Sequence, residues 1–224
     1  MSETPANLAG QLLIAEPRLS DPNFRRSVVL VLAHDAEGAL GVVLNRPTEV
    51  PACEVVEELA SLVDASDMLH DGGPVQRDGV VVLADFAEPE ESERLVVGSV
   101  GMLSDLSEPE RLSESVRRVR AFAGYAGWGA GQLEGELQRE DWFLEPARVD
   151  DVFSAAPGKL WSSSRFSTER SCTAEALRRS VPSTTNSFSV VITKCARSQR
   201  QTARRHPSAE NTTRTAPGTA NGNG

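Results

Sequence analysis

The chain is 224 residues long, enough for one domain with an extensive core or for two small domains. Residues 1–161 contain 29 acidic and 13 basic side chains, a net charge of −16, whereas residues 162–224 carry a net charge of +7. Because an acidic surface repels phosphate backbones, specific nucleic-acid binding by residues 1–161 is not expected.

The N-terminal part of the chain reads as a polar segment followed by strands. Residues 1–9 show no apolar pattern, which predicts a disordered lead-in. Apolar runs of the β type at 10–15, 27–33 and 39–45 predict three strands. The short spacer between the last two contains Asp and Gly, so these two strands are expected to form a hairpin.

One helix and two further strands are predicted in the middle of the chain. Apolar residues at helical spacing predict a helix over 52–64. The Gly-Gly-Pro sequence at 72–74 predicts a turn, and the apolar runs at 79–85 and 94–101 predict strands.

The clearest helical signal comes next. A capping box at Ser107 and an apolar stripe out to Phe122 predict a helix, which Gly124 is placed to end in the left-handed conformation. Residues 131–141 predict a second, short helix, and residues 142–146 predict a strand or a turn.

These elements predict one domain followed by a tail. Strands and helices mix without a strict repeat, which predicts an α+β (mixed α/β) domain with a partly antiparallel sheet over residues 10–161. In residues 162–224, Ser and Thr make up 21 of 63 residues, and Leu, Ile, Val and Phe together only 7. So few apolar side chains cannot form a core, so we expect a low-complexity, disordered tail with one strand-like segment at 187–194.

The cysteines and the hydropathy suggest a compartment. The three cysteines form no CxxC pair, and the sequence has neither an apolar run near the ~18 residues of a membrane span nor a charged-then-apolar leader. We therefore expect a cytoplasmic protein with reduced thiols and no membrane partner.

A glycine-rich segment at 124–137, GYAGWGAGQLEGEL, raises the question of a phosphate-binding loop. A Rossmann fingerprint fails from either possible first glycine, because its sixth position is Gln132 or Glu134, and the expected preceding element is a helix. The segment also lacks the lysine that a P-loop needs. We expect instead that the glycines let Tyr125 and Trp128 pack against backbone in a helix–loop–helix corner, with no nucleotide cofactor.

Three blocks of sequence carry a family likeness. They are LLIAEPRLSDPNFRRSVVLVLAHDAEGALGVVLNRP (12–47), GGPV (72–75) and GYAGWGAGQLEGEL…DW (124–142). In order and spacing they closely resemble the YqgE/AlgH family of bacterial proteins. The resemblance implies a compact fold of α and β elements around a mixed, partly barrel-like sheet. The family's label, transcriptional regulator, comes without a helix-turn-helix or a basic recognition helix in this sequence.

The resemblance breaks after the Leu-Trp pair at 160–161. Family members continue there with a helix, an apolar strand and a short terminus, whereas this chain continues with Ser-rich residues. The break coincides with the changes in charge and in apolar content. Our hypothesis is that the reading frame shifts near Ser162, so that the tail is translated from the wrong frame; the alternative is a genuine disordered tail.

Eight residues are candidates for binding a ligand. Arg46, held extended by Pro47 at a strand end, either grips a carboxylate or phosphate or forms an ion pair within the acidic domain. Gln132 and Glu134 either bind a small ligand together with loop N–H groups or cap the helix that they begin. The full set of candidates is Asn45, Arg46, Gly72, Gly73, Tyr125, Trp128, Gln132 and Glu134.

The sequence predicts no metal site and no catalytic residue. His34 and His70 are the only histidines of residues 1–161, no third ligand follows at zinc-like spacing, and both look like turn residues. We therefore expect a non-enzymatic regulatory domain without a cofactor that binds a small molecule or a protein partner.

The alternative is an enzyme whose cleft is shared by Asn45, Arg46 and the loop at 124–134. A deep pocket with converging polar side chains would favour the enzyme, and a flatter apolar patch would favour the binding domain.

Overall fold

The computed structural model describes residues 7–64, 66–92, 94–167 and 193–194. The strands in these ranges are β1 (Gln11–Ala15), β2 (Val28–Asp35), β3 (Gly38–Val43), β4 (Pro47–Pro51), β5 (Met68–Asp71), β6 (Val75–Phe86), β7 (Leu95–Val97), β8 (Val100–Met102), β9 (Val116–Gly129), β10 (Trp142–Pro146) and β11 (Thr193–Lys194). The helices are α1 (Ala52–Val55), α2 (Pro109–Ser115), α3 (Gln132–Gln138), α4 (Val149–Val152) and α5 (Leu160–Ser167), with 3-10 helices η1 (Glu57–Ser61), η2 (Pro89–Glu91) and η3 (Pro157–Lys159).

Two predictions fall mostly outside these ranges. Of the expected lead-in at 1–9, only residues 7–9 are described, and of the expected tail at 162–224 only residues 162–167 and 193–194. The first six residues of that tail continue α5 past Trp161. No helix among the described residues is long and apolar enough to cross a membrane.

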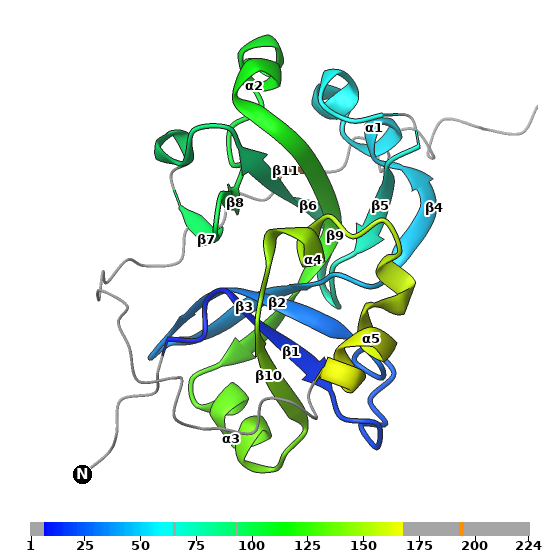
Figure 1. Cartoon of the computed structure of the whole chain (residues 1–224), viewed down its shortest axis with the longest axis vertical. Helices are drawn as coiled ribbons and strands as arrows, with labels where there is room; N and C mark the ends of the chain where they lie inside the picture. Colours follow the sequence, from blue (N-terminus) through cyan, green and yellow to red (C-terminus); the bar gives the residue numbers. More distant parts are fainter. Residues whose placement is uncertain (1–6, 65, 93, 168–192, 195–224) are drawn as a thin grey trace, which may run out of the picture.

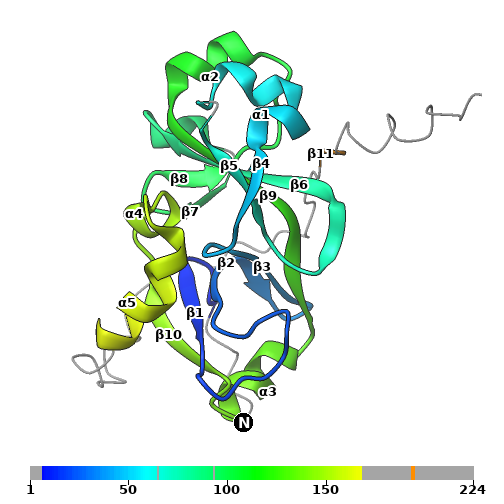
Figure 2. The same cartoon turned by 90° about the vertical axis from the view of Figure 1, so that its right-hand side faces the viewer.

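The fold is a curled, half-barrel sheet with few helices. Its main path runs in the order β10-β1-β2-β3-β9-β6-β8-β7, and every neighbouring pair on that path is antiparallel. Figure 1 shows β9 running through both halves of the sheet, and Figure 2 shows α3 at one end with α1 and α2 at the other. The mixed, partly barrel-like fold predicted from the sequence is confirmed.

The N-terminal strands lie where the apolar runs predict them. β2 and β3 form the expected hairpin, with Asp35 opposite Gly38 at the turn. Nearly every residue of both strands is buried, because side chains pack against both faces of the sheet at this point. The strand at β6 and the short helix α3 are likewise present at the predicted places.

The largest error of the sequence analysis concerns residues 116–129. The helix predicted from Ser107 to Phe122 ends at Ser115 as α2, and the chain continues as the long strand β9. Val119 and Phe122 are three apart as in a helix, but both faces of β9 are buried, Val119 in one cluster and Phe122 in another, so its apolar residues need not alternate. Here pairing along β6 decides, from Val80 opposite Ala123 to Phe86 opposite Val116. The glycine-rich segment therefore starts inside a strand, so the expected helix–loop–helix corner is wrong.

Gly124 does adopt the left-handed conformation, but within β9 and not at a helix end. Its φ is +69°, and a Cβ there would lie 2.7 Å from the backbone oxygens of Gly73 and Val75. The register of β6 against β9 jumps at this point, between Val75 and Val80. The glycine thus allows an irregularity in the strand where another backbone crosses closely.

Two shorter predictions also need correction. The helix expected over 52–64 is broken into α1 and η1, because Val56 is extended (φ −124°, ψ 100°). The strand expected over 94–101 is a hairpin of β7 and β8, turning at Gly98 and Ser99. The turn expected at 72–74 is preceded by β5, which pairs in parallel with β9 and was not predicted.

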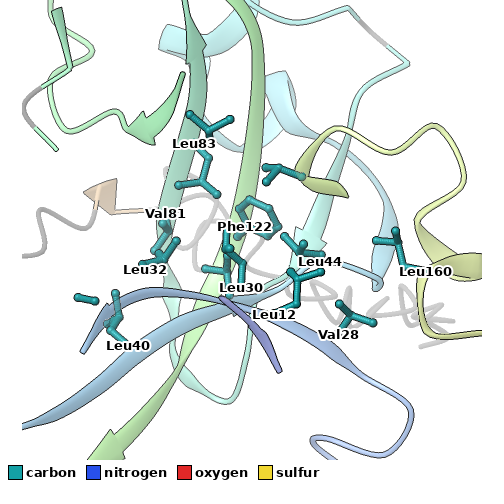
Figure 3. Close-up of a cluster of buried hydrophobic side chains, with 14 of the residues drawn as sticks. Leu12, Val28, Leu30, Leu32, Leu40, Leu44, Val81, Leu83, Phe122 and Leu160 are labelled. Carbon is teal, nitrogen blue, oxygen red and sulfur yellow. The ribbon is translucent and has the colours of Figure 1, made fainter. Parts of the chain in front are cut away.

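Three clusters of buried side chains hold the two halves together. The central one places Phe122 of β9 among side chains of β2, of β6 and of Leu44 directly after β3, as Figure 3 shows for Leu30, Leu44, Val81 and Leu83. A second cluster packs α1, η1 and β6 against the other face of β9. The third surrounds Trp128 and Trp142 beside α3. Because β9 contributes to all three clusters, it is the strand around which the domain is built.

Candidate functional site

The junction of β9 and α3 is held by one carboxylate. Glu136 Oε2 accepts hydrogen bonds from the indole N–H groups of Trp128 (2.8 Å) and Trp142 (2.9 Å), and its Oε1 accepts one from Gln132 Nε2 (2.9 Å). The ring of Phe24 lies against both indoles, 6.0 Å from Trp128 and 5.6 Å from Trp142 between centroids. We call Glu136, Trp128, Trp142 and Phe24 the tryptophan cluster.

Glu134 and Gln132 are also bonded within the protein. His34 Nδ1 accepts the backbone N–H of Leu8 (3.2 Å), so its Nε2 carries the proton and donates to Glu134 Oε1 (2.9 Å). Gln132 Oε1 accepts the N–H of Gly129 (3.2 Å). No side-chain bond caps α3, so the capping role considered for these two residues is wrong, and His34 is a buried strand residue and not a turn residue.

Asn45 and Arg46 hold the ends of two loops. Asn45 Oδ1 accepts the N–H of Val28 (2.9 Å), and its Nδ2 donates to the carbonyl of Arg26 (2.8 Å). The guanidinium of Arg46 donates weakly to the carbonyls of Pro22 (3.5 Å) and Arg25 (3.4 Å). The ion pair considered for Arg46 is not seen among the described residues.

The two glycines at 72–73 lie where backbones cross. Gly72 donates to the carbonyl of Ala123 in β9 (2.8 Å) and accepts from Val43 in β3 (2.9 Å). Gly73 has a φ of +149°, and a Cβ there would lie 2.3 Å from the carbonyl carbon of Tyr125. These glycines, with half-buried Tyr125 beside them, therefore serve the close approach of three chain segments.

None of the eight candidate residues lines the three clefts that we compared on the surface. All but Trp128 and the two glycines are only partly buried or exposed, yet their polar atoms are used mainly in internal hydrogen bonds. Their role in binding a ligand stays a prediction. The clefts, which other residues line, are the better candidates for a binding site.

Two of the clefts contain arginines that are already paired. A cleft of about 280 Å³ beneath α2 includes Arg111, which pairs with Glu108 (3.6 Å). A cleft of about 450 Å³ beside the end of α3 includes Arg18 and Arg139. Arg18 pairs with Glu16 (3.2 Å) and Arg139 with Asp141 (2.9 Å).

The third cleft, of about 380 Å³, lies between the η1–β5 connection and α4. Its lining comprises residues 61–64 and Asp67 on one side, residues 117–120 of β9, and Phe153 after α4. We call it the arginine cleft, because Arg117, Arg118 and Arg120 all contribute to it.

Arg117 and Arg118 are anchored by a buried carboxylate. Asp85, 3% exposed, accepts from Arg118 Nε (3.1 Å) and Nη2 (2.8 Å), from Arg117 Nη1 (3.4 Å) and from the hydroxyl of Ser99 (2.6 Å). Burial alone would raise the pKa of Asp85, but the hydrogen bonds from Ser99 and Arg118 and the two positive charges outweigh it and hold the pKa below its ordinary value. Asp85 is therefore ionised at neutral pH.

Arg120 differs from its neighbours, because it forms no ion pair with any described residue. Its guanidinium is half-buried and donates to the carbonyls of Val152 (2.8 Å) and Ser154 (3.2 Å). It lies 5.9 Å from the ring of Phe153, which Arg118 also faces at 4.6 Å. Burial lowers the pKa of Arg120, the charge of Asp67 opposes this shift, and the charge of Arg118 adds to it.

His70 lies on the neighbouring strand β5 and responds to the same charge. Its Nδ1 donates to the carbonyl of Met68 (3.1 Å), and its buried Nε2 has no hydrogen-bond partner among the described residues. Burial, with a smaller effect from Arg120, lowers its pKa from 6.5 to about 4. His70 is thus a neutral, buried strand residue, and its interpretation as a turn residue is wrong.

The sequence analysis missed the arginine cleft because of the helix prediction. As a helix, residues 117–120 would present arginines on several faces; as the strand β9, they lie at the surface beside α4. The signal was the sequence RRVR in a domain of net charge −16, where a cluster of cations needs an explanation.

A comparison with protein families identifies the chain. The family described as AlgH-like matches residues 12–167, well over half of its length. The protein belongs to the AlgH-like family. The match runs from the second residue of β1 to the end of α5, and includes every residue of the arginine cleft and all eight candidate residues.

Relatives and solved structures of AlgH-like proteins agree with this assignment. The UPF0301 protein SCO2948 of Streptomyces coelicolor is 45% identical over 162 residues, 70% of this chain and 84% of the relative. A UPF0301 protein of Mycobacteroides abscessus is 41% identical over 159 residues, 69% of this chain and 76% of the relative.

Two solved structures share the fold. The crystal structure of protein DIP2367 from Corynebacterium diphtheriae superposes with a TM-score of 0.65 at 28% identity, covering 73% of this chain and 86% of that one. The solution structure of AlgH from Pseudomonas aeruginosa gives a TM-score of 0.58 at 29% identity, covering 82% of this chain and 100% of that one.

Proposed function

We propose that this AlgH-like protein is a non-enzymatic binding domain, whose ligand is a small anionic molecule held in the arginine cleft. The observation that carries the proposal is the half-buried guanidinium of Arg120, which forms no ion pair with any described residue although the domain is strongly acidic. A half-buried charge with no carboxylate in contact is costly, so such a site is completed favourably by a ligand carboxylate or phosphate.

The other clefts offer a comparison within the same molecule. There, Arg18, Arg111 and Arg139 each have a carboxylate of their own within ion-pair distance. In the arginine cleft, Asp85 pairs with Arg117 and Arg118, and among the described residues Arg120 donates only to backbone carbonyls. A ligand anion would therefore compete with backbone carbonyls for Arg120, and with no carboxylate of the described part of the chain in contact with it.

The chemistry of the cleft suits binding better than catalysis. Guanidinium groups stay protonated at neutral pH, so they hold and orient an anion and do not transfer protons. A volume of about 380 Å³ is that of a site for a small molecule.

A small-molecule ligand is favoured over a protein partner by the position of exposed apolar side chains. Among the described residues, the large exposed ones are Leu95 on β7 and Phe143 on β10. They lie on the two end strands of the sheet path, and two exposed large apolar side chains are fewer than an extended apolar docking patch needs.

The proposal is tested by thermal unfolding of the full chain in the presence of phosphate, acetate, citrate and 4-methylpentanoate. A bound ligand stabilises the folded state, by about 2.7 kcal/mol at a hundredfold excess over its Kd. We expect at least one of these anions to raise the Tm of the natural protein and of the control variant Arg139→Gln, but not of Arg120→Gln. A response of Arg120→Gln equal to that of the natural protein, or no response of any of the three proteins, would contradict the proposal.

A further inference from the structure

The arginine cleft carries charges of both signs on opposite walls. Arg118 and Arg120 come from β9, whereas Asp64 and Asp67 come from the connection between η1 and β5. In both other clefts, opposite charges close on each other as ion pairs. Here Arg118 is paired with Asp85 (2.8 Å) and Asp150 (3.5 Å), whereas Arg120 and Asp67 line the same cleft without forming an ion pair.

Asp67 and Arg120 interact without touching. The negative charge of Asp67 raises the pKa of Arg120, so the two charges are close enough to attract each other, yet they form no ion pair. Asp67 is also held in place, because its Oδ2 accepts the backbone N–H of Asp64 (2.9 Å) and its own N–H donates to the Asp64 carbonyl (2.9 Å). The carboxylate is thereby fixed on the wall facing the guanidinium.

Apolar surface lies between and beside these charges. Phe153, packed under the guanidinium groups of Arg118 and Arg120, and half-buried Leu62 and Val63 line the same cleft. A ligand that fills the cleft therefore meets a cation, an anion and an apolar wall at once.

We propose that the ligand of the arginine cleft is a small zwitterion of the amino-acid type with an apolar side chain. This inference rests on the proposed function and deepens it. The ligand carboxylate binds Arg120, with Arg118 beside it, and the ligand ammonium group binds Asp67. The apolar side chain packs against Phe153 and Leu62. Such a ligand satisfies both walls, whereas a simple anion leaves Asp67 facing a second negative charge.

The test compares three probes on the full chain by calorimetric titration. L-Leucine carries both charges, 4-methylpentanoate is its skeleton without the amine, and 3-methylbutylamine is its skeleton without the carboxylate. One charge-assisted contact more is worth about tenfold in affinity, so leucine is expected to bind at least about tenfold more tightly than either analogue.

Two variants and a control connect this preference to the cleft. Asp67→Asn keeps an oxygen that accepts the Asp64 N–H but loses the negative charge. This variant is therefore expected to bind 4-methylpentanoate and leucine with equal affinity. Arg120→Gln is expected to weaken the binding of both leucine and 4-methylpentanoate. The control is Asp78→Asn, which replaces an exposed acid outside the cleft and is expected to change the binding of neither probe.

The outcomes separate this inference from the proposed function. If 4-methylpentanoate binds the natural protein as tightly as leucine, or if Asp67→Asn keeps the preference for leucine, the zwitterion inference is wrong and the cleft is a plain anion site. If neither leucine nor 4-methylpentanoate binds, the zwitterion inference is also wrong. The thermal-unfolding test with the anion series and Arg120→Gln then decides whether the proposed function holds.

Discussion

Replacing Glu136 by alanine removes the one carboxylate that satisfies two buried indoles. Trp128 and Trp142 are 6% and 5% exposed, and both indole N–H groups donate to the same oxygen, Glu136 Oε2. A buried donor without a partner costs about 1–3 kcal/mol. Two such donors, with some relaxation toward water, give an expected loss of about 2–4 kcal/mol in the free energy of unfolding.

The assay is thermal unfolding followed by near-UV circular dichroism, which reports on the packing of the tryptophans. For a domain of this size a loss of 1 kcal/mol lowers the Tm by about 2–4 °C, so the Tm of Glu136→Ala is expected to fall by about 4–16 °C. Alanine is the best helix former, so the loss does not come from weaker helix propensity. The control is Gln138→Ala, which truncates an exposed residue of the same helix. A Tm of Glu136→Ala within about 2 °C of the control would refute the reasoning.

Three further predictions concern the backbone crossing, a buried histidine and the tail. Gly73→Ala places a Cβ 2.3 Å from backbone atoms, in a conformation that only glycine adopts easily. This variant is therefore expected to unfold at a much lower denaturant concentration than the control Gly129→Ala, whose added Cβ meets nothing within 4 Å. Equal unfolding midpoints of the two variants would disprove the close approach. The pKa of His70 is about 4 in the folded protein and 6.5 when unfolded, so the unfolded state binds more protons between these values and stability falls as the pH drops from 6.5 to about 4, by about 3 kcal/mol in total. His70→Phe should flatten this part of the pH profile, and an unchanged slope would show that His70 does not cause it. For the tail, translation of the gene downstream of Ser162 in the other two frames should produce an apolar helix and strand; the frameshift hypothesis fails if neither frame does.

The strands with strong local patterns were predictable from sequence. β1, β2 and β3 are nearly continuous apolar runs bounded by polar turns, so period and composition agree about them. β9 was not predictable in this way, because its N-terminal half carries a helix-compatible apolar spacing and follows a real helix start at Pro109. Only the pairing with β6, which joins residues far apart in the sequence, makes it a strand.

The candidate residues from sequence lie at positions that are important to the fold. Gly73 permits a backbone crossing, Asn45 joins two loops, and Trp128 and Gln132 are bonded to Glu136. Sequence alone does not distinguish a polar residue that bonds inward from one that awaits a ligand, because the partner in each case comes from a distant segment. The same limit hid Arg120, which forms no ion pair within the described part of the chain because Asp85 pairs with its two neighbours, Arg117 and Arg118.

The central claim is that the guanidinium of Arg120 holds the ligand anion. It is tested most directly by NMR of the arginine side-chain Nε–H groups while the full chain is titrated with L-leucine and with 4-methylpentanoate. We predict that the Arg120 resonance shifts and saturates with at least one of the two probes, while that of Arg139, paired with Asp141 outside the cleft, stays in place. An Arg120 resonance that does not move, or that moves only as far as that of Arg139, would contradict the account.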